Sequence, residues 1–134
     1  MTVVVDASVA VKWVLRENGS DAADALLDED GLIAPAIWLA EAANALWRRA
    51  RMSEIAADEA RERLLELQNA PVASIAIDAH IEQALMLATR LGHPVYDCLY
   101  LALAVRQNTH VVTADRRFAS AAAGELAGRV RLLG

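Results

Sequence analysis

The stretch TVVVDAS, residues 2–8, indicates the type of fold. Residues 2–5 form a short β-branched run of the kind found in buried strands. Asp6 ends this run, and Ser8 can cap a helix that continues to about Leu15. A strand that runs through an acidic residue directly into a helix is the beginning of an alternating strand–helix fold.

The same arrangement returns near the other end of the chain. The stretch HVVTAD, residues 110–115, places a strand at 110–113 before Asp115 and a helix at 115–123. Further strands are predicted at residues 32–34 and 72–75, with a short edge strand at 130–132. These strands are continuous apolar runs rather than alternating patterns, which is typical of a parallel sheet covered by helices on both faces.

Helices are predicted between these strands. They cover residues 21–28, a segment from Pro35 to Arg51, a segment after a Ser53 cap, a segment from an Asp78 cap to Gly92, and a segment from Pro94 to Gln107. In the helix that ends at Gly92, the spacing of Ile81, Leu85 and Ala88 predicts that these three residues face the core.

Composition narrows the class of protein. A chain of 134 residues is expected to form one domain, 1–134, and its 56% hydrophobic content is ample for a core. The net charge of −5 argues against non-specific, charge-driven nucleic-acid binding. The lone Cys98 excludes an intrachain disulfide. No apolar run is long enough to span a membrane and no signal peptide is visible, so we expect a cytoplasmic protein with no membrane partner.

Four acidic residues stand where chemistry is expected. Asp6 and Asp115 follow strands, and ligands of open α/β sheets bind beyond the carboxyl ends of the strands. Each can equally be an ordinary helix cap. Glu41 lies in a nearly apolar helix with no other ionisable residue before Arg48, where an ion pair with Arg48 or a narrow solvent face is the alternative. Asp97 directly precedes the longest apolar run, residues 98–105. A favourable contact with the helix dipole is the alternative explanation of Asp97.

Taken together, these four acids predict a metal site. Carboxylates that converge on one cleft repel one another and require a cation, and all-oxygen ligands select Mg²⁺ or Mn²⁺. Such an ion can polarise a phosphate and generate a hydroxide nucleophile at neutral pH. Ser8 and Thr113 can hold a water or a phosphate beside the acids, although capping explains them as well. Arg116 and Arg117 can bind phosphate or be solvated surface charges.

The remaining histidines and tryptophans are interpreted as structural. The histidines show no metal-ligand spacing, and the tryptophans suit core or interface positions. These residues are His80, His93, His110, Trp13, Trp38 and Trp47.

The chain resembles the PIN-domain ribonucleases of the VapC toxin kind over its whole length. The resemblance is carried, in order, by VVVDASVAVKW (3–13), PAIWLAEAANALWRR (35–49), VYDCLYLALA (95–104) and VVTADRRF (111–118). It implies a three-layer α/β/α sandwich with a five-stranded parallel sheet, and it assigns Asp6, Glu41, Asp97 and Asp115 to catalysis and to one or two Mg²⁺ or Mn²⁺ ions. It also implies in-line cleavage of RNA to a 5′-phosphate and a 3′-hydroxyl, a VapB-type antitoxin partner in a type II toxin–antitoxin system, and a homodimer.

Three other functions are weighed against this one. A haloacid-dehalogenase-like phosphatase needs a second Asp two residues after the first, and Ser8 occupies that position. A non-catalytic binding module on the same scaffold is a further alternative, which the intact acids disfavour. A housekeeping RNA-processing nuclease of the same family is the third, and the identity of the neighbouring gene would separate it from a toxin.

Overall fold

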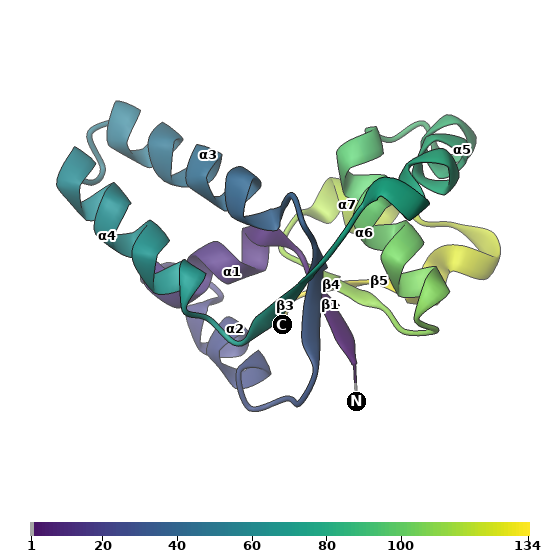
Figure 1. Ribbon diagram of the computed structural model, residues 1–134, viewed down its shortest axis with the longest axis horizontal. Coiled ribbons are helices and arrows are strands. Elements are labelled where there is room, and N and C mark those ends of the chain that lie inside the picture. The colour runs from purple at the N-terminus through teal and green to yellow at the C-terminus, as the bar shows by residue number, and fades with distance from the viewer. Residues whose placement is uncertain (1) are drawn as a thin grey trace.

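A five-stranded parallel sheet forms the middle of the molecule (Figure 1). The computed structural model describes residues 2–134. The strand order is β3-β2-β1-β4-β5, and every neighbouring pair is parallel. The strands are β1 (Val3–Val5), β2 (Leu32–Pro35), β3 (Val72–Ile75), β4 (Val111–Thr113) and β5 (Val130–Leu132). The predicted parallel sheet is confirmed.

Helices cover both faces of the sheet and complete three layers (Figure 1). One layer contains α1 (Ala7–Val14), α2 (Ser20–Leu26), α3 (Trp38–Arg51) and α4 (Ala57–Gln68). The opposite layer contains α5 (Ile81–Leu91), α6 (Val95–Arg106) and α7 (Arg116–Ala121). Two 3₁₀ segments, η1 (Asp78–His80) and η2 (Gly124–Arg129), precede α5 and β5.

Helix α6 is the central element of its layer. It lies against β1, β2 and β4 on one side and against α5 on the other. Residues 98–104 are all buried, because this helix has neighbours on nearly every side. A helix that is apolar all round is the expected sequence for such a position. Asp97 lies in the first turn of this helix, directly before the buried residues, and is itself partly buried.

Several predicted helix starts are wrong. Pro35 is the last residue of β2, and α3 begins at Trp38. Ser8 lies inside the first turn of α1, whose N-cap position is held by Asp6. Ser53 adopts a positive φ of 60° in the turn before α4, whose N-cap is Ala56. Asp78 belongs to η1 and does not cap α5. In each case tertiary contacts placed the boundary a few residues from the strongest local signal.

The prediction for the inward face of α5 is correct only for Ala88, which packs against the core. Ile81 and Leu85 are 46% and 54% exposed, whereas Ala84 and Leu87 are buried. Apolar residues occur on more than one side of this helix, so periodicity alone does not select a stripe. The small Ala84 lies in the helix face that packs near α6, which allows a close approach between the two helices.

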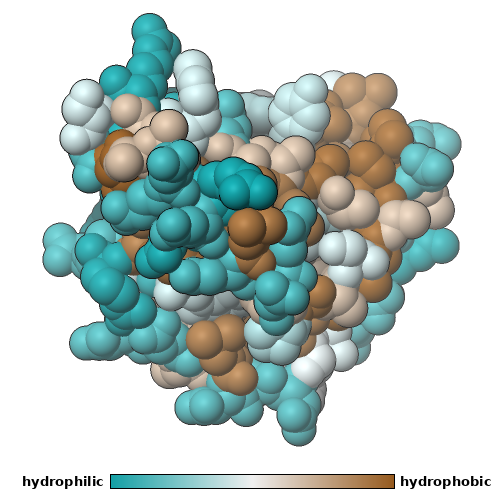
Figure 2. All heavy atoms as spheres, turned by 60° about the vertical axis from the view of Figure 1, so that its left-hand side comes forward, coloured by the Kyte–Doolittle hydropathy of each residue, from teal (hydrophilic) through white to brown (hydrophobic). Residues whose placement is uncertain are grey.

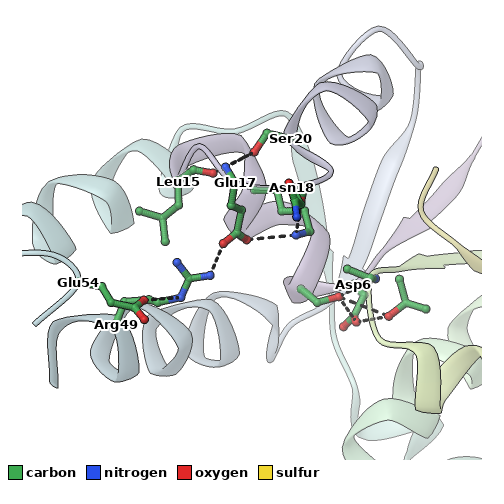
Figure 3. A network of polar contacts seen from close by, with 11 residues as sticks. Asp6, Leu15, Glu17, Asn18, Ser20, Arg49 and Glu54 are labelled. Carbon is green, nitrogen blue, oxygen red and sulfur yellow. Dashed lines mark hydrogen bonds and ion pairs between the residues drawn. The ribbon is translucent and has the colours of Figure 1, made fainter. Parts of the chain in front are cut away.

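A partly buried network of charged side chains connects α1 to α3 (Figure 3). Glu17 accepts hydrogen bonds from Arg49 of α3 and from Lys12 of α1, the latter at 3.2 Å. Arg49 also pairs with Glu54 at 3.3 Å. Burial raises the pKa of Glu17, but the hydrogen bonds from Arg49 and Lys12 lower this pKa by more, and the net shift is downward. The charged form of Glu17 therefore stabilises the folded state.

Replacing Glu17 by Gln is expected to lower the free energy of unfolding at pH 7 by about 1–2 kcal/mol. Because the folded-state pKa lies below the ordinary 4.5, the contribution is present above pH 4.5 and disappears as the pH falls below it. Denaturant unfolding at pH 7 and near pH 3 measures this change. Glu66→Gln, which removes a more exposed partner of Arg63, is the control and should cost under about 0.5 kcal/mol. An equal cost of Glu17→Gln at both pH values would contradict an ionic role.

The surface is not uniformly hydrophilic. Figure 2 shows hydrophilic side chains over the left and lower part of one face and hydrophobic side chains gathered at its upper right. The large hydrophobic side chains with the highest exposed fractions are Met52, Met86 and Tyr96.

Among the described residues 2–134, no helix has the length and apolar character that a membrane span requires.

Candidate active site

Asp6 is held at the carboxyl end of the central strand. Its backbone N–H donates to the carbonyl of Val112 on β4 at 3.0 Å, which continues the β1–β4 pairing. Its side chain is only 6% exposed. Oδ2 accepts hydrogen bonds from Ser8 Oγ and from Thr113 Oγ1, both at 2.7 Å (Figure 3). Both hydrogen bonds therefore hold one carboxylate oxygen in place.

Ser8 and Thr113 also organise the loop that leads to Asp115. Ser8 Oγ accepts from the backbone N–H of Ala114 at 3.0 Å, and Thr113 Oγ1 accepts from the backbone N–H of Asp115 at 3.0 Å. Each hydroxyl thus accepts from this loop and donates to Asp6. The two hydroxyls position the acids relative to each other, which is a more specific role than the capping alternative considered for them.

Glu41 meets a tyrosine from the opposite layer. The Tyr100 hydroxyl of α6 donates to Glu41 Oε1 at 2.6 Å, and Tyr100 itself is fully buried. Burial, the charges of Asp6 and Glu41, and this hydrogen bond all raise the pKa of Tyr100, so the hydroxyl stays protonated and donates. The ion pair with Arg48 that offered an alternative explanation of Glu41 does not occur among residues 2–134.

Asp97 is paired with a histidine that sequence reasoning treated as structural. His93 Nε2 lies 2.6 Å from Asp97 Oδ2. The imidazole ring stacks on Phe118 of α7, with ring centroids 5.3 Å apart. The four-residue spacing between His93 and Asp97 could have indicated this contact. It was not recognised because Pro94 marks the start of the helix and places His93 outside it. His93 therefore orients an acid of the site.

Asp115 has the capping role that was its alternative interpretation. Its Oδ1 accepts from the backbone N–H groups of Arg117 at 2.9 Å and Phe118 at 3.4 Å, at the start of α7. Its side chain is exposed and also lines the same cleft as the other three acids. Capping through one oxygen leaves the second carboxylate oxygen for a ligand, so both roles are compatible.

One cleft brings the four acids together. It has a volume of about 470 Å³ and lies where β1 and β4 end, the point at which the strand order reverses. Ligands of open α/β sheets bind at this kind of position. The lining residues are Asp6, Ala7, Ser8, Ile37, Ala40, Glu41, Asn44, Ala45, Arg48, Tyr96, Asp97 and Asp115. Arg116 and Arg117 are exposed and are not among them.

A second cavity of the same volume lies at the opposite edge of the sheet, beside Thr2, His110 and Arg131. Its lining includes one carboxylate, Glu125, which is engaged by Arg90 at 3.0 Å. The first cleft therefore differs from the second in having four carboxylates, none of which is paired with an arginine or lysine among the described residues.

Burial and the crowding of the acids raise the pKa values of two of them, Asp6 and Glu41. Burial raises the pKa of Asp6, and the nearby Asp97 charge adds to this, although hydrogen bonds from Ser8 and Thr113 act in the opposite direction. Burial is also the main cause of the raised pKa of Glu41. The hydrogen bond from Tyr100 opposes this shift, and the charges of Asp6 and Asp97 add smaller upward shifts. These three carboxylates are therefore close enough to interact, and a cation between them would relieve the repulsion.

The donor set fits a hard divalent cation. All four ligand candidates are carboxylates, the type that Mg²⁺ and Mn²⁺ prefer. Within residues 2–134, no group of three or more His, Cys, Asp or Glu side chains is already drawn together tightly enough to hold a metal ion. Mg²⁺ binds through one or two carboxylates and keeps several waters, so a preassembled group of three ligands is not required.

Comparisons with known proteins agree on one family. Residues 3–124 match the family model described as PIN domain. Ribonuclease VapC3 of Pyrobaculum aerophilum is 33% identical over 123 residues, which cover 89% of this chain and 93% of that protein.

Two solved structures share the fold. The crystal structure of PAE2754 from Pyrobaculum aerophilum has a TM-score of 0.75 at 21% identity and covers 98% of this chain and 83% of that chain. A chain in the crystal structure of VapBC2 from Rickettsia felis, bound to a DNA fragment from their promoter, has a TM-score of 0.68 at 15% identity and covers 100% of both chains. The three-layer architecture of this chain is therefore the one found in these proteins.

Proposed function

Because this chain belongs to the PIN-domain family, and within it to the VapC-type proteins, we propose that it is a metal-dependent endoribonuclease. The observation that carries the proposal is the meeting of Asp6, Glu41, Asp97 and Asp115 in one cleft, although they come from four separate segments. The PIN-domain match covers residues 3–124, and we propose that residues 1–134 act as one domain.

In the proposed mechanism each acid has a defined support. Asp6 and Asp97 are the main metal ligands, with Asp6 held by Ser8 and Thr113 and Asp97 by His93. Glu41 is aligned by Tyr100, and the oxygen of Asp115 that does not cap α7 completes the set. When bound, Mg²⁺ or Mn²⁺ neutralises charge on the phosphate and makes water nucleophilic at neutral pH. Arg116 and Arg117, outside the cleft, are proposed to contact flanking RNA phosphates.

The purified protein is expected to cleave single-stranded RNA in the presence of Mg²⁺ or Mn²⁺ and to stop when EDTA is added in excess. The cleaved ends should carry a 5′-phosphate, which end-specific ligation measures. Adding back Mn²⁺ after EDTA should restore cleavage, which controls for damage to the protein. Undiminished cleavage in EDTA would contradict the metal mechanism, and RNA binding without any cleavage would favour the non-catalytic alternative.

We further propose a VapB-type antitoxin as the protein partner. The structural neighbour from Rickettsia felis is named VapBC2 and is bound to a DNA fragment from 'their promoter', wording that supports a VapB-type partner for this chain. Four carboxylates line the cleft, so an inhibitory segment is expected to enter it with Arg or Lys side chains. The same cleavage assay tests this, because the antitoxin encoded beside the gene should abolish cleavage. A homodimeric state and a cytoplasmic location are part of the same proposal, and light scattering in solution tests the first.

A further inference from the structure

The acid cleft also contains groups that metal binding does not use. Within the described chain, residues 2–134, Arg48 is the single basic residue that lines it, and Arg48 forms no ion pair with any acid there. The neighbouring Arg49, in contrast, is committed to Glu17 and Glu54. An arginine that lines an acidic cleft without pairing to its carboxylates is available to a ligand.

The position of Arg48 separates it from the acid cluster. Arg48 follows Glu41 by seven residues on α3, with Asn44 and Ala45 between them on the same cleft-lining side. Seven residues of helix correspond to about 10 Å along the axis. Arg48 is therefore placed to bind a phosphate other than the one that the four acids would process.

Tyr96 is the second unused group. It lines the cleft directly before Asp97 on α6, and it is 67% exposed. Aromatic side chains at the edge of a nucleic-acid site act as stacking platforms for unpaired bases, because every base has a flat face. A base that is paired within a duplex cannot stack on Tyr96 in this way.

We propose that Arg48 and Tyr96 form a binding site for single-stranded RNA beside the acid cluster, in which Arg48 contacts a phosphate next to the scissile one and Tyr96 stacks on an unpaired base. This inference rests on the proposed ribonuclease function. The net charge of −5 means that general attraction cannot bring RNA to the cleft, so specific local contacts are required. The basic side chains expected of an antitoxin segment would go to the acids, whereas Arg48 attracts anions, which favours an RNA phosphate as its ligand.

Binding is measured by fluorescence anisotropy with a labelled single-stranded oligoribonucleotide and with a hairpin duplex of equal length. The measurements use the Asp6→Asn background with Mg²⁺ present, so that the RNA is not consumed. Three variants are compared, namely Arg48→Gln, Tyr96→Leu and Tyr96→Phe. Arg51→Gln is the matched control, because Arg51 lies on the same helix and is exposed outside the cleft.

Arg48→Gln is expected to weaken binding of the single strand about fivefold at 0.1 M salt and to reduce the slope of log K against log salt by about 0.7. Tyr96→Leu should weaken it at least about fivefold without changing the salt slope, and Tyr96→Phe should retain binding. Neither Tyr96 variant should change duplex binding. In cleavage assays on the wild-type background, Arg48→Gln should raise KM and leave kcat within about twofold.

Equal effects of Arg48→Gln and Arg51→Gln, or equal losses for Tyr96→Leu and Tyr96→Phe, would overturn the proposal. It would also be overturned if Arg48→Gln changed inhibition by the antitoxin but not RNA binding. Failure of the ribonuclease function is recognised separately, because wild type would then not cleave RNA with Mg²⁺ at all.

Discussion

Replacing Asp97 by Asn is expected to lower kcat for RNA cleavage by about 10²–10³-fold while the protein stays folded. Asp97 lines the cleft, and its charge acts on both Asp6 and Glu41. Asparagine has nearly the same shape and can still hydrogen-bond to His93, but it lacks the negative charge that holds a divalent cation. Loss of the charge therefore removes metal-dependent stabilisation of the reaction without disturbing the buried part of α6.

The measurement is steady-state cleavage at saturating Mg²⁺, accompanied by circular dichroism and a thermal melt. Asp58→Asn is the matched control, because Asp58 is also an acid in the first turn of a helix but is exposed outside the cleft. This control should keep full activity. If Asp97→Asn retains more than about a tenth of wild-type kcat, Asp97 is not a metal ligand and its role is limited to the contact with His93.

Replacing Asp6 by Asn is expected to make the metal-free protein more stable than wild type, by about 1–3 kcal/mol. Two like charges at ~5 Å repel by about 3 kcal/mol at an effective dielectric of 20, and screening reduces this value. The hydrogen bonds that Ser8 and Thr113 donate can go to the amide oxygen of asparagine instead. The substitution therefore removes the buried charge and keeps the hydrogen bonds from these two hydroxyls.

Metal binding should make wild type more stable than Asp6→Asn, the reverse of the order expected without metal. A divalent ion at 100 times its dissociation constant adds about 2.7 kcal/mol to a protein that binds it only when folded, and Asp6→Asn should lose most of this gain. Thermal melts in EDTA and across a Mn²⁺ titration measure both effects, again with Asp58→Asn as the control. If Asp6→Asn melts well below wild type in EDTA and keeps the whole metal shift, Asp6 is an ordinary structural residue.

The pH dependence of stability checks independently whether Asp6→Asn stabilises the metal-free protein. Burial raises the pKa of Asp6 above its ordinary 3.8, so the charged carboxylate destabilises the metal-free fold at pH values above the raised pKa. Below pH 3.8 the carboxyl group is neutral in both the folded and the unfolded chain. The advantage of Asp6→Asn should therefore be largest near neutral pH and should shrink as the pH falls.

The positions of the strands, and of the two acids that follow them, could be read directly from the sequence. A β-branched run such as residues 3–5 and the Asp that ends it are adjacent in the chain, and parallel pairing brings the ends of β1 and β4 to the same edge. The apolar run that follows Asp97 marked the stretch of α6 in which residues 98–104 are buried, whereas the nearly apolar helix that carries Glu41 is buried only at Trp38, Ala42 and Leu46. The correctly predicted features depend on residues that are neighbours in the chain, so they can be predicted from short stretches of the sequence.

The contacts that support the acids depended on the tertiary structure. Tyr100 lies 59 positions from Glu41, and Thr113 lies 107 positions from Asp6, so no periodicity connects the members of either pair. Tyr100 of α6 reaches Glu41 of α3 because these helices, from opposite layers, come together beside the cleft. Leu85 is exposed, although its spacing predicted burial, because α5 turns Ala84 and Leu87 toward the core.

By itself, the sequence determined an alternating strand–helix fold with acids placed at the ends of two strands, because strand and helix preferences and chain adjacency are local. The tertiary structure decided which oxygen of each acid is engaged in a hydrogen bond: Oδ2 of Asp6, Oε1 of Glu41, Oδ2 of Asp97 and Oδ1 of Asp115. It also decided that, among residues 2–134, Arg48 forms no ion pair along the cleft. These properties depend on how helices from opposite layers meet across the sheet, and that is set by the sum of many long-range packing contacts rather than by any short stretch of residues.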